Sequence, residues 1–329
     1  MVALSISILG NFGVTWPHWK RFVAQIEALG FAGLFRSDHF TLQDADLDSL
    51  ELIVSLTYLA ATTERVHFGP LVAPLSFRDP VMLARQALAL DDLSNGRMVL
   101  GLGTGYQERE HLMFGYNLGD VPTRYARLAE GLEVITRLLR SDTPVSYAGQ
   151  FYTLDDAILL PRPQRPGGPP ILIGGSGPQR TLPLVARYAD IWNGQLMTAI
   201  EFAERSALLD ELVQAAGRQP EDVRRTMTFV AICGHNRAEI ERRLQWTRVL
   251  SMFTALPIEE LIDALRRDVK AFVGTPHELV AHIQAYVAAG ADEIVLQWGD
   301  MDDIEGLEVL AHEVLPHLVS QDPHATVRM

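Results

Sequence analysis

The chain has 329 residues, of which 48 % are hydrophobic and 21 % are charged, and its formal net charge is -13. This composition is typical of a compact globular protein and excludes a disordered chain. The excess of acidic side chains opposes a nucleic-acid backbone and an anionic membrane, so we expect neither as a partner.

Cysteine and lysine are scarce, which narrows the chemistry further. Cys233 is the single cysteine, which excludes a disulfide framework and thiolate zinc clusters. Lys20 and Lys270 are the two lysines and no Gly-Lys-Ser/Thr step occurs, so Schiff-base and P-loop enzymes are disfavoured. Residues 2–9 are apolar but lack a cationic leader, and no apolar run is long enough to cross a bilayer. We therefore expect a cytoplasmic protein.

Short apolar runs rich in β-branched residues alternate with amphipathic stretches along the chain. This alternation is typical of parallel strands joined by helices. Eight such runs predict an α/β fold, the (β/α)₈ barrel, with an open doubly wound sheet as the alternative. The predicted strands cover residues 3–9, 33–36, 66–71, 98–102, 171–173, 190–192, 226–233 and 293–297.

Two of the intervening helices have clear start and stop signals. Asp79-Pro80 begins a helix that ends at Asn95-Gly96. Thr275-Pro276-His277-Glu278 has the pattern of a capping box with proline at the first helical position, and Gly290 ends that helix. Both have one apolar face, so we expect them to pack on the sheet.

Residues 141–170 read as an insertion after the fourth strand. Two short runs, 145–147 and 151–153, flank a Gly149-Gln150 turn, and a proline-rich stretch follows. This pattern predicts a hairpin and an extended linker rather than a domain boundary. We therefore expect one barrel domain over residues 1–319 and a flexible tail over 320–329.

The ends of the predicted strands are polar or rich in glycine, and in a barrel the catalytic groups follow the strands. The second strand is followed by Asp38 and His39. His39 is a candidate general base whose tautomer Asp38 would fix; the alternative is a structural pair. Arg36, within the second strand, is expected in an ion pair inside the barrel or at the ligand cavity. We interpret Cys233 as core filler.

Two glycine-rich segments follow the fourth and fifth strands. Gly174-Gly175-Ser176-Gly177 precedes a helix with Arg180 in its first turn, which suggests a phosphate site, the alternative being a tight turn. Gly101-x-Gly103-x-Gly105 fails as a dinucleotide fingerprint because Tyr106 occupies the place of the third glycine. A loop for close approach of a ligand and a plain turn both remain open for it.

Spacings that bind metals are missing from the sequence. There is no His-x-His strand, no His-Glu-x-x-His helix and no calcium loop, and Glu108-x-x-His111 alone is insufficient. A metal-dependent barrel lyase or hydrolase is therefore a disfavoured alternative. The scattered histidines, among them His18, His67, His235 and His282, are expected at the surface or as capping groups.

Four segments together resemble the bacterial-luciferase-like oxidoreductase family. They are LGFAGLFRSDHF at 29–40, LSNGRMVLGLGTGY at 93–106, PPILIGGSG at 169–177 and ARYADIWN at 186–193. The resemblance implies a barrel that binds reduced FMN or the deazaflavin F420 at the carboxyl ends of its strands. It also implies an oxidoreductase or monooxygenase that acts on a small organic substrate and forms a homodimer or homotetramer.

The same resemblance assigns roles to individual residues. It places His39 beside the reactive face of the ring and the end of the third strand against the ring. Asp38, from its position beside His39, is the second catalytic candidate. The expected cofactor-binding residues are Asn11, Leu71, Val72, Ala73, Thr104, Gly105, Tyr106, Gly174, Gly175, Ser176, Gly177 and Arg180.

One position departs from the family pattern. F420-dependent sugar-phosphate dehydrogenases of this family usually have a glutamate directly after the Gly-x-Gly step, where this chain has Tyr106, and Glu108 comes two residues too late. Sugar-phosphate oxidation is therefore in doubt, while residues 35–39 resemble F420-associated members. A flavin-binding homologue without catalytic activity is a further alternative, and the sequence leaves FMN and F420 both open.

Overall fold

The computed structural model describes residues 2–41, 45–249 and 253–318. Its parallel sheet runs in the order β3-β2-β1-β12-β10-β9-β8-β5-β4, with β11 beside β10. The strands are β1 (Ala3–Ile8), β2 (Gly33–Arg36), β3 (His67–Pro70), β4 (Ala73–Pro74), β5 (Leu100–Gly103), β8 (Ile171–Gly174), β9 (Ile191–Gln195), β10 (Arg224–Cys233), β11 (Phe272–Gly274) and β12 (Glu293–Trp298).

The sheet closes into a barrel between β3 and β5. Phe68 and Met98 form a parallel bridge there, and the Val99 N–H donates to the Phe68 carbonyl at 2.8 Å. The two strands approach closely because Gly69 and Gly101 lack side chains: a Cβ on either would collide with a backbone carbonyl of the other strand. The predicted barrel is thus confirmed, and the open doubly wound sheet is wrong.

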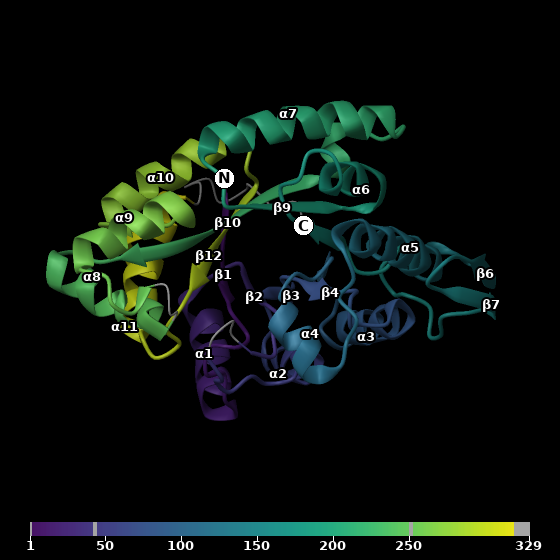
Figure 1. The fold of residues 1–329 in the computed structure, drawn as a ribbon, viewed down its shortest axis with the longest axis horizontal. Helices are drawn as coiled ribbons and strands as arrows, with labels where there is room; N and C mark the ends of the chain where they lie inside the picture. Colours follow the sequence, from purple (N-terminus) through teal and green to yellow (C-terminus); the bar gives the residue numbers. More distant parts are fainter. Residues whose placement is uncertain (1, 42–44, 250–252, 319–329) are drawn as a thin grey trace.

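Helices surround the sheet (Figure 1). Both helices with clear sequence signals begin as predicted: the Asp79 side chain caps α3 and a complete capping box at Thr275 begins α10. The helices are α1 (Trp16–Leu29), α2 (Leu52–Thr62), α3 (Pro80–Leu93), α4 (Glu108–Phe114), α5 (Val121–Arg140), α6 (Thr181–Tyr188), α7 (Ala199–Ala215), α8 (Arg237–Arg243), α9 (Ile258–Asp268), α10 (Pro276–Ala288) and α11 (Ile304–Val309).

The predicted insertion contains the expected hairpin. Strands β6 (Val145–Ala148) and β7 (Thr153–Ala157) pair antiparallel and lie at the edge of the molecule beyond α5 (Figure 1). The single-domain boundary stays a prediction, and the expected flexible tail, residues 320–329, lies outside the described residues. In the described part of the chain, no helix is both long and apolar enough to pass through a bilayer.

Buried polar groups correct two of the expectations. Arg36 lies outside the barrel, stacked over Trp19 of α1, where it donates to Ser55 Oγ at 2.6 Å and to the Leu50 carbonyl at 2.8 Å. Successive side chains of a strand point to opposite faces of the sheet, so Phe35 faces the barrel interior and Arg36 faces the surrounding helices. The prediction of an ion pair inside the barrel is therefore wrong. Burial lowers the pKa of Arg36 to about 10. His282 is half-buried and packs against the rings of Phe229 and Tyr286, so it is not a surface group.

Cys233 is buried at the end of β10, as expected for a residue that fills space. Burial raises the pKa of its thiol to about 12. The thiolate needed for nucleophilic chemistry is therefore not formed at neutral pH.

Arg97, beside the place where β3 and β5 close the barrel, is hydrogen-bonded to the chain segment before β3. It is 9 % exposed, and its guanidinium donates to the carbonyls of Ala60, Thr63, Val66 and Ser94 and to Thr63 Oγ1. Its loss would leave these buried acceptors without a donor.

We therefore expect Arg97→Met to lower the free energy of unfolding by about 3 kcal/mol or more, since each unsatisfied buried acceptor costs about 1–3 kcal/mol. Urea unfolding followed by circular dichroism measures the change. Arg187→Met is the matched control, because Arg187 is exposed and its ion pair with Glu133 contributes little. A loss at Arg97 no larger than at Arg187 would contradict the expectation.

Candidate active site

A cavity of about 520 Å³ opens at the carboxyl ends of the strands. Its walls come from successive strand ends around the barrel, which is where barrel enzymes place their chemistry. Eight predicted site residues line it: Asp38, His39, Leu71, Val72, Thr104, Gly105, Tyr106 and Gly174. Asp38 and His39 therefore lie at the same end of the barrel as the glycine-rich segment that begins at Gly174.

Val72 forms the floor of this cavity between two glycines. A Cβ on Gly103 would lie 2.5 Å from Val72 Cγ2, and a Cβ on Gly174 would lie 3.1 Å from Val72 Cγ1. The two glycines thus leave room for the Val72 side chain. The glycine pattern after the fourth strand serves packing at Gly103 and a turn at Gly105, whose φ is +73°.

His39 is held by a carboxylate from a different element. Its Nδ1 lies 3.0 Å from Glu110 Oε1, and Glu110 Oε2 accepts the Phe40 N–H at 2.9 Å. Glu110 belongs to α4 and is 1 % exposed. The Tyr106 ring packs edge-on against the imidazole at a centroid distance of 5.2 Å. An ionised Glu110 selects the tautomer that carries the proton on Nδ1, which leaves Nε2 as an acceptor.

Asp38 does not fix that tautomer. Its two carboxylate oxygens accept from Arg78 Nε at 2.7 Å and Nη2 at 2.8 Å. Asp38 is 4 % exposed, and this burial raises the pKa of its carboxyl group in spite of the arginine. The tautomer-fixing role expected of Asp38 is filled by Glu110, and a direct catalytic role for Asp38 stays a prediction.

The glycine-rich segment lies at the rim of the cavity. Gly175 has a φ of +126° and its N–H donates to the Asn193 carbonyl, while the Ser176 hydroxyl donates to the Gln195 carbonyl at 2.9 Å. Within the described residues, the N–H groups of Ser176 and Gly177 have no protein acceptor. They precede α6, so they are available to an anion at its amino end.

Arg180 stands beside this segment, with its guanidinium 5.8 Å from the centre of the Tyr125 ring. The Tyr125 hydroxyl is 2.9 Å from Thr181 Oγ1 in the first turn of α6. A cation and a hydroxyl thus flank the free N–H groups. The expected phosphate site remains a prediction that this arrangement accommodates.

Six predicted cofactor residues do not line the cavity: Gly175, Ser176, Gly177 and Arg180, which stand next to its rim, and Asn11 and Ala73, which lie elsewhere. Asn11 is 2 % exposed and its Nδ2 donates to the Thr41 carbonyl at 2.6 Å, while its Oδ1 has no partner among the described residues. Ala73 is fully buried and packs in the main core, where β4 pairs with β5. Neither side chain touches the space beside His39.

The sequence did not predict several other residues of the site. Glu110 had no signal, because it meets His39 across a separation of 71 residues. Asn193, Thr228 and Gln297 also line the cavity. For Asn193 and Gln297 the available signal was their place near the ends of β9 and β12, whereas Thr228 lies in the middle of β10. Asn193 Nδ2 donates to Thr228 Oγ1 at 2.9 Å, which holds the amide in place.

The pair of His39 and Glu110 leads to a test. We expect Glu110→Gln to lower turnover by about tenfold to a hundredfold, because the amide offers an N–H to Nδ1 and favours the tautomer with the proton on Nε2. Steady-state kinetics measure the effect. Glu108→Gln is the control, since Glu108 is an exposed carboxylate on the same helix. Equal rates in both variants would exclude this role for Glu110.

No group of three or more His, Cys, Asp or Glu side chains in the described parts of the chain is arranged to hold a metal ion. His111, the possible metal ligand of the sequence, is buried and bonded internally. Its Nδ1 lies 2.7 Å from the Gln107 carbonyl and its Nε2 lies 2.7 Å from Ser76 Oγ. His111 therefore serves to hold α4 in place.

Comparisons with known proteins show what the whole chain is similar to. The model of the luciferase-like monooxygenase family matches residues 8–293. A relative from Amycolatopsis mediterranei, an F420-dependent glucose-6-phosphate dehydrogenase, is 27 % identical, with 90 % of this chain and 93 % of the relative covered. A 4-hydroxyprotoasukamycin monooxygenase of Streptomyces nodosus subsp. asukaensis is 32 % identical, but over 50 % of this chain and 43 % of its own.

Solved structures share the fold. An F420-dependent secondary alcohol dehydrogenase in complex with an F420-acetone adduct superposes with a TM-score of 0.80. The comparison covers 97 % of this chain and 100 % of the other at 20 % identity. The relatives thus include both F420-dependent dehydrogenases and monooxygenases, and the barrel is common to them.

Proposed function

Because this chain belongs to the luciferase-like monooxygenase family and is an oxidoreductase, we propose that it uses F420 to transfer a hydride to or from a small apolar alcohol or ketone. The observation that carries the proposal is the pair of His39 and Glu110 beside an apolar cavity floor at the carboxyl ends of the strands. A hydride exchange at an alcohol carbon needs one group that takes or gives a proton.

The residues present fit a flat ring with a phosphate-bearing tail. Leu71 and Val72 offer an apolar surface, and Gly103 and Gly174 have no side chain that would crowd Val72. The N–H groups of Ser176 and Gly177, with Arg180 nearby, would hold the phosphate. F420, when bound, supplies the carbon that exchanges the hydride.

Side chains of the protein would take up and return the hydroxyl proton of the alcohol. His39 Nε2 accepts the hydroxyl proton of an alcohol as it is oxidised and returns it to a ketone in the reverse direction. Glu110 accepts from Nδ1, so it keeps the ring oriented and stabilises the imidazolium that forms. The arrangement is that of a base with a carboxylate orienter.

The rim of the cavity favours an apolar substrate. Tyr106 stands where sugar-phosphate dehydrogenases of this family usually have a glutamate, and an aromatic cluster lies next to His39. Phe40 packs against Phe77 at 4.6 Å and against Phe114 at 5.1 Å between ring centroids. Phe114 is 55 % exposed, so this cluster, which does not itself line the cavity, adds apolar surface on the side of His39.

A second candidate is an FMN-dependent monooxygenase. The description of the family favours it, and so does the relative from Streptomyces nodosus that is named as a monooxygenase. That relative is more identical to this chain than the glucose-6-phosphate dehydrogenase is, but it matches only half of this chain. The apolar floor and the rim donors would serve FMN equally well. The two candidates differ in the cofactor bound and in whether oxygen is consumed.

The deciding experiment titrates the purified protein with F420, FMN and reduced FMN, followed by fluorescence and absorbance. We expect micromolar binding of F420 and its reduction by apolar secondary alcohols, without reduction by glucose 6-phosphate. Binding of FMN with oxygen uptake would establish the second candidate instead. If none of the three binds, both candidates are wrong.

We also propose that the protein works in the cytoplasm as a homodimer or homotetramer. The single buried cysteine suits a reducing compartment, and the oligomeric state rests on the family resemblance. Light scattering coupled to gel filtration measures the assembly, and a monomer at micromolar concentration would contradict it.

A further inference from the structure

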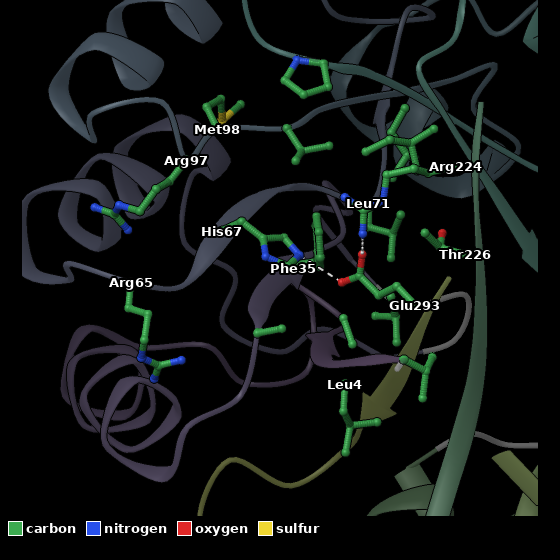
Figure 2. A pocket seen from close by; sticks show the side chains of 18 of the residues that line it. Leu4, Phe35, Arg65, His67, Leu71, Arg97, Met98, Arg224, Thr226 and Glu293 are labelled. Carbon is green, nitrogen blue, oxygen red and sulfur yellow. Dashed lines mark hydrogen bonds and ion pairs between the residues drawn. The ribbon is translucent and has the colours of Figure 1, made fainter. Parts of the chain in front are cut away.

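A second cavity, of about 410 Å³, lies at the opposite end of the barrel (Figure 2). Its lining comes from the amino ends of the strands, among them Ala3, His67, Arg224 and Glu293. One layer of side chains separates it from the candidate active site, and Leu71 touches both cavities. The layer consists of Phe35, Val99, Leu172, Ile191 and Val295. A barrel interior is ordinarily filled, so a cavity of this size at the amino end is unusual.

Most of the lining is apolar. Leu4, Phe35, Leu71 and Met98 surround the space from several sides (Figure 2). The volume falls within the range of small-molecule sites, and such sites combine an apolar wall with a few placed polar groups. The cavity therefore suits a molecule with an apolar body.

The polar groups in the cavity centre on one buried carboxylate. Glu293 is 2 % exposed. Its Oε1 lies 2.8 Å from His67 Nε2 and accepts a hydrogen bond from Ser5 Oγ at 2.5 Å. Its Oε2 accepts a hydrogen bond from Arg224 Nη2 at 3.2 Å. The expectation that His67 is a surface or capping group is thus wrong. Burial would raise the pKa of Glu293, but His67 and Arg224 hold it down to about 2. Arg224 and the imidazole of His67 thus both contact this carboxylate.

Arginine dominates the charge of the lining. Arg224 uses one nitrogen for Glu293, and its Nε and Nη1 have no partner among the described residues. Arg65 and Arg97 lie on the side of His67 away from Glu293 (Figure 2) and donate to backbone carbonyls. Arg165 pairs with Asp91. The lining thus has four arginines and one carboxylate, Glu293, in a chain whose net charge is -13.

We propose that this second cavity is a binding site for an amphipathic anion, an apolar chain that ends in a single carboxylate. The chain lies against the apolar lining, and the carboxylate receives a hydrogen bond from a free donor of Arg224, Nε or Nη1. A hydrogen bond between a guanidinium and a carboxylate is charge-assisted and is stronger than one between neutral groups. The proposal does not rest on the proposed function: the two cavities share the Leu71 side chain, but neither His39 nor Glu110 lines this one.

Decanoate is the probe that tests the site, measured by isothermal titration on the full chain with decanol as the uncharged comparison. We expect one decanoate per chain and weaker binding of decanol. Arg224→Gln removes the charge, and Ala32→Leu fills part of the cavity from a position that is half-buried in its lining. Each should weaken decanoate binding by about tenfold or more, since a hydrogen bond to a charged group contributes more than a neutral one.

The control is Tyr106→Ala, which alters the other cavity and should leave decanoate affinity unchanged. Circular dichroism shows whether each variant is folded, and the two test variants act by different means, so one remains informative if the other fails to fold. The proposal is overturned if decanoate does not bind, if decanol binds as well as decanoate, if both test variants bind decanoate like the parent, or if Tyr106→Ala weakens it.

Discussion

Replacing His39 by alanine should lower turnover by about a hundredfold to ten-thousandfold and leave cofactor affinity nearly unchanged. The imidazole lines the cavity, and the hydrogen bond from Nδ1 to Glu110 leaves Nε2 as its free acceptor. Loss of the ring removes the proton acceptor but none of the apolar floor or the rim donors. Steady-state kinetics and a fluorescence titration of the cofactor, measured on the same preparation, separate the two effects.

His235→Ala is the matched control for this substitution. The His235 ring lies on the surface between Glu239 and Glu313, at 3.1 and 2.8 Å, and it does not line the cavity. We expect its turnover to equal that of the parent. Full activity of His39→Ala would remove His39 from the reaction, whereas an equal loss of binding and turnover would assign it to cofactor binding alone.

The fold was predictable because its signals are local. Alternation of short apolar runs with capped helices appears in the sequence at each element, and the capping box at Thr275 and the cap at Asp79 both stand where they were predicted. The short strand β11 was missed, since it pairs with the far end of β10 and has three residues. Its existence depends on a neighbour that no local pattern identifies.

The site was predictable only in part, because strand ends are visible in a sequence and long-range pairs are not. His39 and Gly174 were expected from their positions and Val72 from the family resemblance, and the three meet at one cavity. Glu110 was missed because it reaches His39 from a different helix. The glycines after the fourth strand were read as a turn or a ligand loop, but two of them are needed for packing against β3 and Val72.

The close contact between Gly103 and Val72 leads to the second prediction with a large expected effect, which concerns the floor of the cavity. We expect Gly103→Ala to weaken cofactor binding by about tenfold to a hundredfold, because overpacking of this kind costs about 1–3 kcal/mol. The new Cβ would lie 2.5 Å from Val72 Cγ2, so the valine side chain has to move into the cavity, where we propose that the ring binds. Gly174→Ala should have a smaller effect, since its Cβ would lie 3.1 Å from Val72 Cγ1. Fluorescence titration with the bound cofactor measures both.

A double variant distinguishes this cause from a general disturbance of β5. Val72→Ala removes both methyl groups that the new Cβ atoms meet, so Gly103→Ala combined with Val72→Ala should bind the cofactor better than Gly103→Ala alone. Val72→Ala by itself should cost some affinity, because it removes apolar surface from the floor. If the double variant binds no better than Gly103→Ala, the loss comes from the strand backbone and Val72 is not the residue that supports the ring.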